Sequence, residues 1–207
     1  MRKSSVKITF DNFLETMEGD IDLLKKLHFA EVVVRTREEK AEIHEAFVFK
    51  VCASWEIFTQ DLLIDCLNKD TSQYSLHTGY HLPKHLSRDI CNAMIFGVGY
   101  QDFKNVSHLK SFAKQVLVSV YNPFQKIPRN SSQKIDGCYV IRNYLAHYSY
   151  AAERKLKEMY RSNGMRRFRE PGDFLMSITR GENITRSAAY ILAFIEASKE
   201  MATFLSI

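Results

Sequence analysis

The sequence predicts an all-α protein built around one long central helix. Strand signals are scarce, because the alternating segment 6–10 is short and runs into Asp11-Asn12, a typical helix start. From Arg37 to Leu67, apolar side chains recur at steps of three and four residues and so share one helical stripe: Phe47, Val51, Trp55, Phe58 and Leu62. No Pro or Gly interrupts this segment, so we expect a single helix about 45 Å long with its stripe in the core.

Further helices are expected on both sides of the central one. Their approximate ranges are 11–29, 84–96, 108–120, 132–148 with a continuation to 161, and 186–205. Pro83 suits the first position of its helix, and the expected N-caps are Ser107, Ser131-Ser132 and Thr185. The polar segment 68–82 is expected to be a loop, and Ser162-Asn163-Gly164 is expected to end a helix.

Length and composition favour a single globular domain. The chain has 207 residues, of which 45% are hydrophobic and 26% charged, with a net charge of +5. We expect residues 11–161 to form the core bundle and residues 162–207 to form a loop and a C-terminal helix. The four cysteines include no Cys-x-x-Cys pair, which argues against a zinc ribbon or a thioredoxin-type site.

A cytoplasmic location is the expectation from the apolar pattern. The N-terminal stretch MRKSSVKITF lacks the apolar segment of a secretory signal. The longest apolar run, 188–195, is much shorter than a membrane span.

The segment Ile141-Arg142-Asn143-Tyr144-Leu145-Ala146-His147 carries the clearest chemical signal. At 100° per residue, Asn143 and His147 share a polar stripe with Asp136, whereas Arg142 lies among apolar positions. An arginine at an apolar border either reaches solvent or pairs with a carboxylate. Glu56 lies at a similar border of the central helix, so we hypothesise that Glu56 pairs with Arg142 and fixes its direction.

These residues resemble a known family. Arg142, Asn143 and His147 resemble the Arg-x4-His signature of the HEPN superfamily, whose members are all-helical and include many metal-independent endoribonucleases. The segment Ala53-Ser54-Trp55-Glu56-Ile57-Phe58 resembles the Trp-Glu-x-aromatic pattern of the RiboL-PSP-HEPN-like subgroup. The two segments lie about 90 residues apart and, with the helices around them, cover about two thirds of the chain.

The resemblance implies a HEPN-type bundle that acts on RNA as a homodimer. Arg142, Asn143 and His147 of two chains would form one composite site, supported by Glu56, without a metal or cofactor. An imidazole can transfer protons near neutral pH, and a guanidinium can stabilise charge on phosphoryl oxygens. Such proteins are often toxins or defence effectors restrained by a partner such as an antitoxin. HEPN toxins paired with nucleotidyltransferases often carry Tyr two residues after the His, where this chain has Ser149.

A basic stretch follows the motif. Residues 151–169 contain two acidic and seven basic residues, the latter being Arg154, Lys155, Lys157, Arg161, Arg166, Arg167 and Arg169. Such a surface suits an RNA backbone. Aromatic residues that are able to stack on unpaired bases are interleaved with it: Tyr148, Tyr150, Tyr160 and Phe168.

Other interpretations stay open. The chain is alternatively a catalytically silent HEPN-like module that binds nucleotides, RNA or protein, or an unrelated helical protein whose basic face binds nucleic acid or a membrane surface. Under these interpretations, the motif is an ordinary helix end and Glu56 is a structural ion-pair partner. The basic stretch is then a solvated helix face. His77, His81 and His85 recur every fourth residue, but Gly79 and Pro83 interrupt them, so no metal site is predicted.

Overall fold

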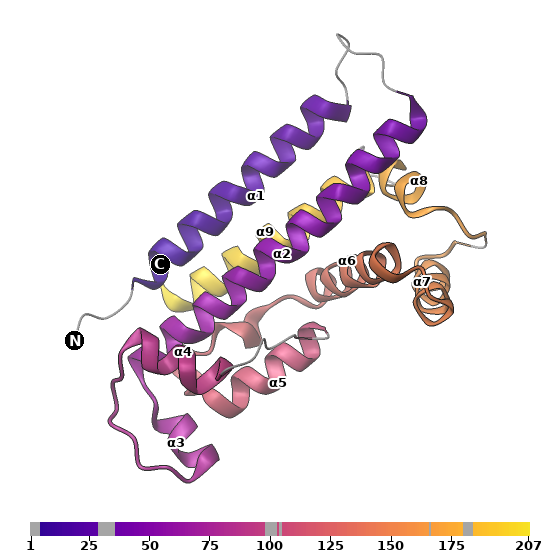
Figure 1. Cartoon of the computed structure of the whole chain (residues 1–207). Helices are drawn as coiled ribbons and strands as arrows, with labels where there is room; N and C mark the ends of the chain where they lie inside the picture. The colour runs from indigo at the N-terminus through magenta and orange to yellow at the C-terminus, as the bar shows by residue number, and fades with distance from the viewer. Residues whose placement is uncertain (1–4, 29–35, 98–102, 104, 166, 180–183) are drawn as a thin grey trace.

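The computed structural model describes residues 5–28, 36–97, 103, 105–165, 167–179 and 184–207 (Figure 1). Nine α-helices occur in these residues: α1 (Val6–His28), α2 (Arg37–Lys69), α3 (Ser72–Thr78), α4 (Arg88–Phe96), α5 (Val106–Val116), α6 (Arg129–His147), α7 (Tyr150–Ser162), α8 (Pro171–Met176) and α9 (Arg186–Leu205). Two short 3₁₀ helices, Ser119–Tyr121 and Pro123–Lys126, join α5 to α6. The only β-type pairing among the described residues is an isolated bridge between Ile178 and Thr185. The all-α prediction is confirmed.

The long central helix is confirmed as α2. Thr36 caps it by accepting the backbone N–H of Glu39, and the Glu39 side chain accepts the Thr36 N–H in return. Trp55 is only 2% exposed. Figure 1 shows α1 antiparallel to α2, and α9 and α6 also pack against α2. Aromatic contacts join these layers, with Phe13 of α1 stacked on Phe58 of α2 and Phe194 of α9 edge-on to Trp55.

Several N-terminal boundaries differ from the sequence expectation. The alternating segment 6–10 forms the first turns of α1, because Val6 and Phe10 are spaced at i, i+4 and are both buried on its inner face. A short helix, α3, lies inside the expected loop 68–82. Helix α4 begins at Arg88 and not near Pro83, because Ser87 accepts the Ile90 N–H as the N-cap.

Helix boundaries later in the chain also differ from the sequence expectation. Asn105, and not Ser107, caps α5 by accepting the His108 N–H. Helix α6 begins directly after Pro128, and its Ser131 is buried and donates to Glu196 of α9, so it does not act as a cap. Thr185 caps α9 as predicted, by accepting the Ala188 N–H.

The core continues beyond residue 161. Helix α9 buries Ile191, Phe194 and Met201 in the same cluster as α2 and α6. Helix α8 lies inside the expected loop after residue 161 and packs so closely on α2 that a Cβ at Gly172 would lie 2.5 Å from the Cβ of Ala41. Helices α8 and α9 therefore belong to the same core as α1, α2 and α6.

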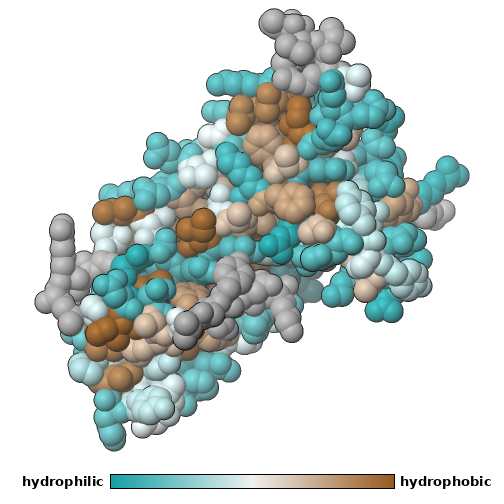
Figure 2. Space-filling model, in the orientation of Figure 1, coloured by the Kyte–Doolittle hydropathy of each residue, from teal (hydrophilic) through white to brown (hydrophobic). Residues whose placement is uncertain are grey.

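The face of the molecule drawn in Figure 2 is mixed in polarity. Figure 2 shows apolar patches interrupted by hydrophilic side chains over the face that carries α1 and α2. Within the described part of the chain, none of the helices combines the length and apolar character needed to cross a membrane.

Candidate functional site

The predicted motif lies at the C-terminal end of α6, where the chain turns into α7. Helix α6 ends at His147, and Tyr148 adopts a left-handed conformation with a φ of 44°. The Tyr148 N–H donates to the Tyr144 carbonyl at 2.8 Å. Ser149 then caps α7 by accepting the Ala152 N–H at 3.2 Å. Ser149 therefore has a structural role here, and α7 begins only three residues after His147.

Arg142 is held by a carboxylate from another helix. Its Nη2 lies 3.7 Å from Oε1 of Glu56 in α2, so the hypothesised Glu56–Arg142 pair is confirmed. Its Nη1 donates to Oδ1 of the adjacent Asn143 at 3.2 Å. The Glu56 side chain is 16% exposed and that of Arg142 31% exposed, so the pair lies at the edge of the core. The guanidinium is thereby oriented while part of it still faces solvent.

Two buried thiols lie one helical turn before this pair. The sulfur atoms of Cys52 in α2 and Cys138 in α6 lie 3.7 Å apart. The contact with Cys138, together with burial, raises the pKa of the Cys52 thiol well above its usual value. Protonated thiols in this position pack like small apolar side chains, so they hold α2 against α6 where the ion pair forms.

His147 faces solvent one turn after Asn143. Its side chain has no hydrogen-bond or ion-pair partner among the residues that the structure describes, and the neighbouring Tyr148 and Tyr150 are 66% and 81% exposed. The structure therefore brings Glu56, Arg142 and Asn143 together and leaves the imidazole beside them on an open surface. One chain supplies one imidazole to this surface.

Asp136, which the sequence places on the same polar stripe, has a separate role. Its Oδ1 accepts the backbone N–H of Val106 at 2.8 Å, which satisfies the first turn of α5. Burial raises the pKa of this carboxyl group, and the Val106 N–H and Lys110 oppose that shift. Asp136 thus joins α5 to α6.

The basic stretch divides into paired and unpaired side chains. Arg154 lies 3.9 Å from Glu158, and Lys157 pairs with Glu153 and lies 5.4 Å from the centre of the Phe168 ring. The remaining described members are exposed and have no ion pair within the described part of the chain: Lys155, Arg161, Arg167 and Arg169. Arg166 lies outside the described residues. The stretch therefore offers at least four solvent-facing cations beside the motif.

The prediction that Tyr160 stacks on bases is wrong. Tyr160 is 1% exposed and packs against Phe174, so it cannot reach a base. Leu156 and Tyr160 lie at i, i+4 on the inner face of an amphipathic α7, a spacing already visible in the sequence. Tyr148, Tyr150 and Phe168 retain exposed ring surface.

The three recurring histidines do not come together on one helix. Helix α3 ends at Thr78, and Gly79 follows in a left-handed conformation with a φ of 78°. No group of three or more potential metal ligands occurs in the ranges that the structure describes.

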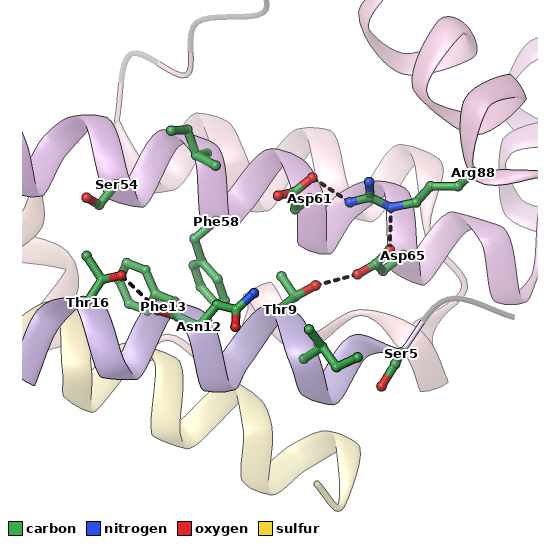
Figure 3. Close-up of a pocket in the computed structure, with 12 residues that line it drawn as sticks. Ser5, Thr9, Asn12, Phe13, Thr16, Ser54, Phe58, Asp61, Asp65 and Arg88 are labelled. Carbon is green, nitrogen blue, oxygen red and sulfur yellow. Dashed lines mark hydrogen bonds and ion pairs between the residues drawn. The ribbon is translucent and has the colours of Figure 1, made fainter.

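Sequence reasoning missed a groove of about 500 Å³ between α1 and α2 (Figure 3). At one end, Arg88 of α4 donates to Asp61 and, from Nε at 3.0 Å, to Oδ1 of Asp65. Thr9 of α1 donates to the other oxygen of Asp65 at 2.6 Å. The Asp65 side chain is 2% exposed, so this network ties α1, α2 and α4 together. The i, i+4 carboxylates of Asp61 and Asp65 are the only sequence signal for it.

A second cavity, of about 770 Å³, lies between α6 and α7, with Tyr190 of α9 at its side. It is lined by polar side chains of the face of α6 that also carries His147.

Comparisons with known proteins found no relative of this chain. No family model matches the chain, and no curated protein or solved structure shows significant similarity to it.

Proposed function

We propose that this protein is a metal-independent endoribonuclease of the HEPN type that acts in the cytoplasm as a homodimer. The observation that carries the proposal is the arrangement at the end of α6. Arg142 is oriented by Glu56 and Asn143, and the exposed imidazole of His147 follows one turn later. The exposed cations of α7 and the segment after it lie next to this arrangement in the chain.

The chemistry needs two proton transfers. One imidazole removes the proton of the ribose 2′-hydroxyl, and the resulting 2′-oxygen attacks the adjacent phosphorus. The bond from phosphorus to the 5′-oxygen breaks, and a second imidazole protonates the leaving oxygen. The products end in a 2′,3′-cyclic phosphate and a 5′-hydroxyl. Arg142 stabilises the additional negative charge on the phosphoryl oxygens during this step.

A homodimer supplies the second imidazole. One chain presents a single His147 on an open face, and a symmetric pair of such faces would place two imidazoles and two guanidinium groups around one phosphodiester. The exposed Tyr148 and Tyr150 at this face are suited either to base stacking or to the contact between chains. A toxin or defence role, restrained by an antitoxin or another partner, is part of the same proposal.

The decisive experiment measures RNA cleavage in EDTA. We expect the protein to cut single-stranded RNA without a metal, and Arg142→Ala and His147→Ala each to lower the rate at least about 100-fold. Arg129→Ala and His81→Ala replace exposed residues of the same types away from the motif and should keep the rate. Circular dichroism confirms that each variant is folded.

Other outcomes point elsewhere. RNA binding without cleavage would favour the catalytically silent module. Cleavage that survives both motif substitutions would exclude this site. Sedimentation velocity tests the dimer, because a strict monomer that still cuts RNA contradicts the composite site.

A further inference from the structure

The cavity between α6 and α7 lies on the same face of the molecule as His147. Val140 lines the cavity and lies seven residues before His147, so both side chains project from one side of α6. At 1.5 Å per residue, the two positions are about 10 Å apart along the helix. An RNA strand whose phosphodiester sits at His147 would pass the mouth of this cavity within a few nucleotides.

The polar lining of the cavity includes two carboxylates and several amides. Asp136 of α6 contributes a carboxylate whose Oδ1 already accepts from Val106, Glu158 of α7 contributes one that lies 3.9 Å from Arg154, and Gln133 contributes an amide. The Asn163 amide nitrogen already donates to the Met159 carbonyl at 2.8 Å, which leaves its oxygen as the group that can serve a ligand. Two carboxylates repel a phosphate, but they accept hydrogen bonds from amino groups. Lys134 is the one cation among the described lining residues.

Apolar side chains also line the cavity. Val140 and Met159 provide apolar surface that suits the flat face of a ring. Gly137 lets α6 approach Tyr190 closely at this cavity, because a Cβ at this position would lie only 3.3 Å from the Tyr190 hydroxyl. Nucleobases combine a flat apolar face with an edge of hydrogen-bonding groups, which matches this lining.

We propose that this cavity binds a nucleobase that carries an exocyclic amino group. Guanine, adenine and cytosine have such a group, whereas uracil has none, so the carboxylates of Asp136 and Glu158 discriminate against uracil. The position of this base, a few nucleotides from the cleaved bond, rests on the proposed nuclease function. The cavity therefore selects the RNA sequence that reaches the site.

The test compares the binding of 5′-GMP and 5′-UMP, which the protein cannot cleave. We expect GMP to bind about tenfold more tightly than UMP by isothermal titration calorimetry. The double variant Gln133→Ala with Glu158→Gln should show a smaller preference, because it removes one of the two carboxylates. The matched control, Gln115→Ala with Glu153→Gln, changes exposed or half-buried residues of the same types on α5 and α7 outside the cavity and should keep it.

Two results would overturn the assignment. One is equal affinity of the unmodified protein for GMP and UMP, and the other is a preference of unchanged size in the cavity variant. Cleavage of short RNAs with guanine or uracil at each position near the cut separates this inference from the nuclease proposal. A preference for GMP without RNA cleavage supports base binding in the cavity and contradicts the nuclease proposal. Cleavage with no base preference at any position contradicts base selection by the cavity.

Discussion

At the scale of single residues, His44 of α2 is a buried polar group held between two other helices. It is fully buried, its Nδ1 lies 2.6 Å from Oγ of Ser187 in α9, and its Nε2 lies 2.9 Å from Nδ1 of His28 in α1. Burial, together with the nearby His28 and Lys40, lowers the pKa of His44 to about 4. The imidazole is therefore neutral in the folded protein near pH 7.

This residue predicts a loss of stability in acid. The unfolded chain binds the His44 proton below a pH of about 6.5, whereas the folded chain binds it only near pH 4, so protonation favours unfolding between these values. We expect the free energy of unfolding, measured with urea, to fall by about 2 kcal/mol from pH 7 to pH 5. His44→Asn should show a smaller fall. A curve as steep as that of the unmodified protein would contradict this role of His44.

Two glycines give a second prediction at this scale. Gly172 lies against Ala41, where a Cβ would approach within 2.5 Å, whereas a Cβ at the exposed Gly19 of α1 would meet nothing within 4 Å. We expect Gly172→Ala to destabilise the protein by about 1–3 kcal/mol through overpacking. Gly19→Ala should stabilise it by about 0.5–1 kcal/mol. Thermal unfolding checks both, and an equal shift for the two variants would contradict the close packing of α8 on α2.

At the scale of elements, α7 separates its faces clearly. Leu156 and Tyr160 are buried, while Lys155 and Arg161 are exposed. The outer face is therefore able to contact an RNA backbone without any change in the core.

The salt dependence of RNA binding tests this face. Each phosphate contact to single-stranded RNA contributes about 0.7 to the slope of log K against log salt. In a His147→Ala background, in which the RNA stays intact, we expect Lys155→Ala with Arg161→Ala to reduce the slope by about 1.4. Lys25→Ala with Lys114→Ala removes the same charge from exposed sites on α1 and α5 and should leave the slope unchanged. Equal effects of the two pairs would indicate a response to net charge alone.

At the scale of the whole molecule, α2 contacts α1, α4, α6 and α9 through polar side chains at its two ends and its centre. His44 near the start of α2 contacts α1 and α9, Glu56 in the middle contacts α6, and Asp65 near the end contacts α1 and α4. The candidate site thus depends on the same helix that organises the core.

The network at the end of α2 gives a prediction at this scale. Arg88→Ala would leave the buried Asp65 carboxylate with Thr9 as its remaining bonded partner among those given above. We expect a loss of about 1–3 kcal/mol in unfolding free energy, since Arg88 is itself half exposed. Arg37→Ala removes an exposed pair with Asp173 and should cost at most about 0.5 kcal/mol. Equal losses in urea unfolding would show that the Asp65 network does not hold α4.

The sequence was informative where structure depends on neighbours along the chain. The stripe around Trp55 predicts α2, and Thr185 predicts the start of α9, because helical periodicity and capping act within a few residues. The same local reasoning placed Tyr160 on the RNA-facing surface, because it gave more weight to the surrounding charges than to the spacing from Leu156.

The sequence by itself determined the all-α class, the long central helix and the candidate residues Arg142, Asn143 and His147. Only the tertiary structure decided that Glu56 reaches Arg142, that Arg88 and Thr9 meet at Asp65, and that a polar cavity opens beside α6. The physical reason is that these contacts depend on the relative register and rotation of packed helices. Side-chain packing over the whole core sets that register, and no short stretch of sequence encodes it.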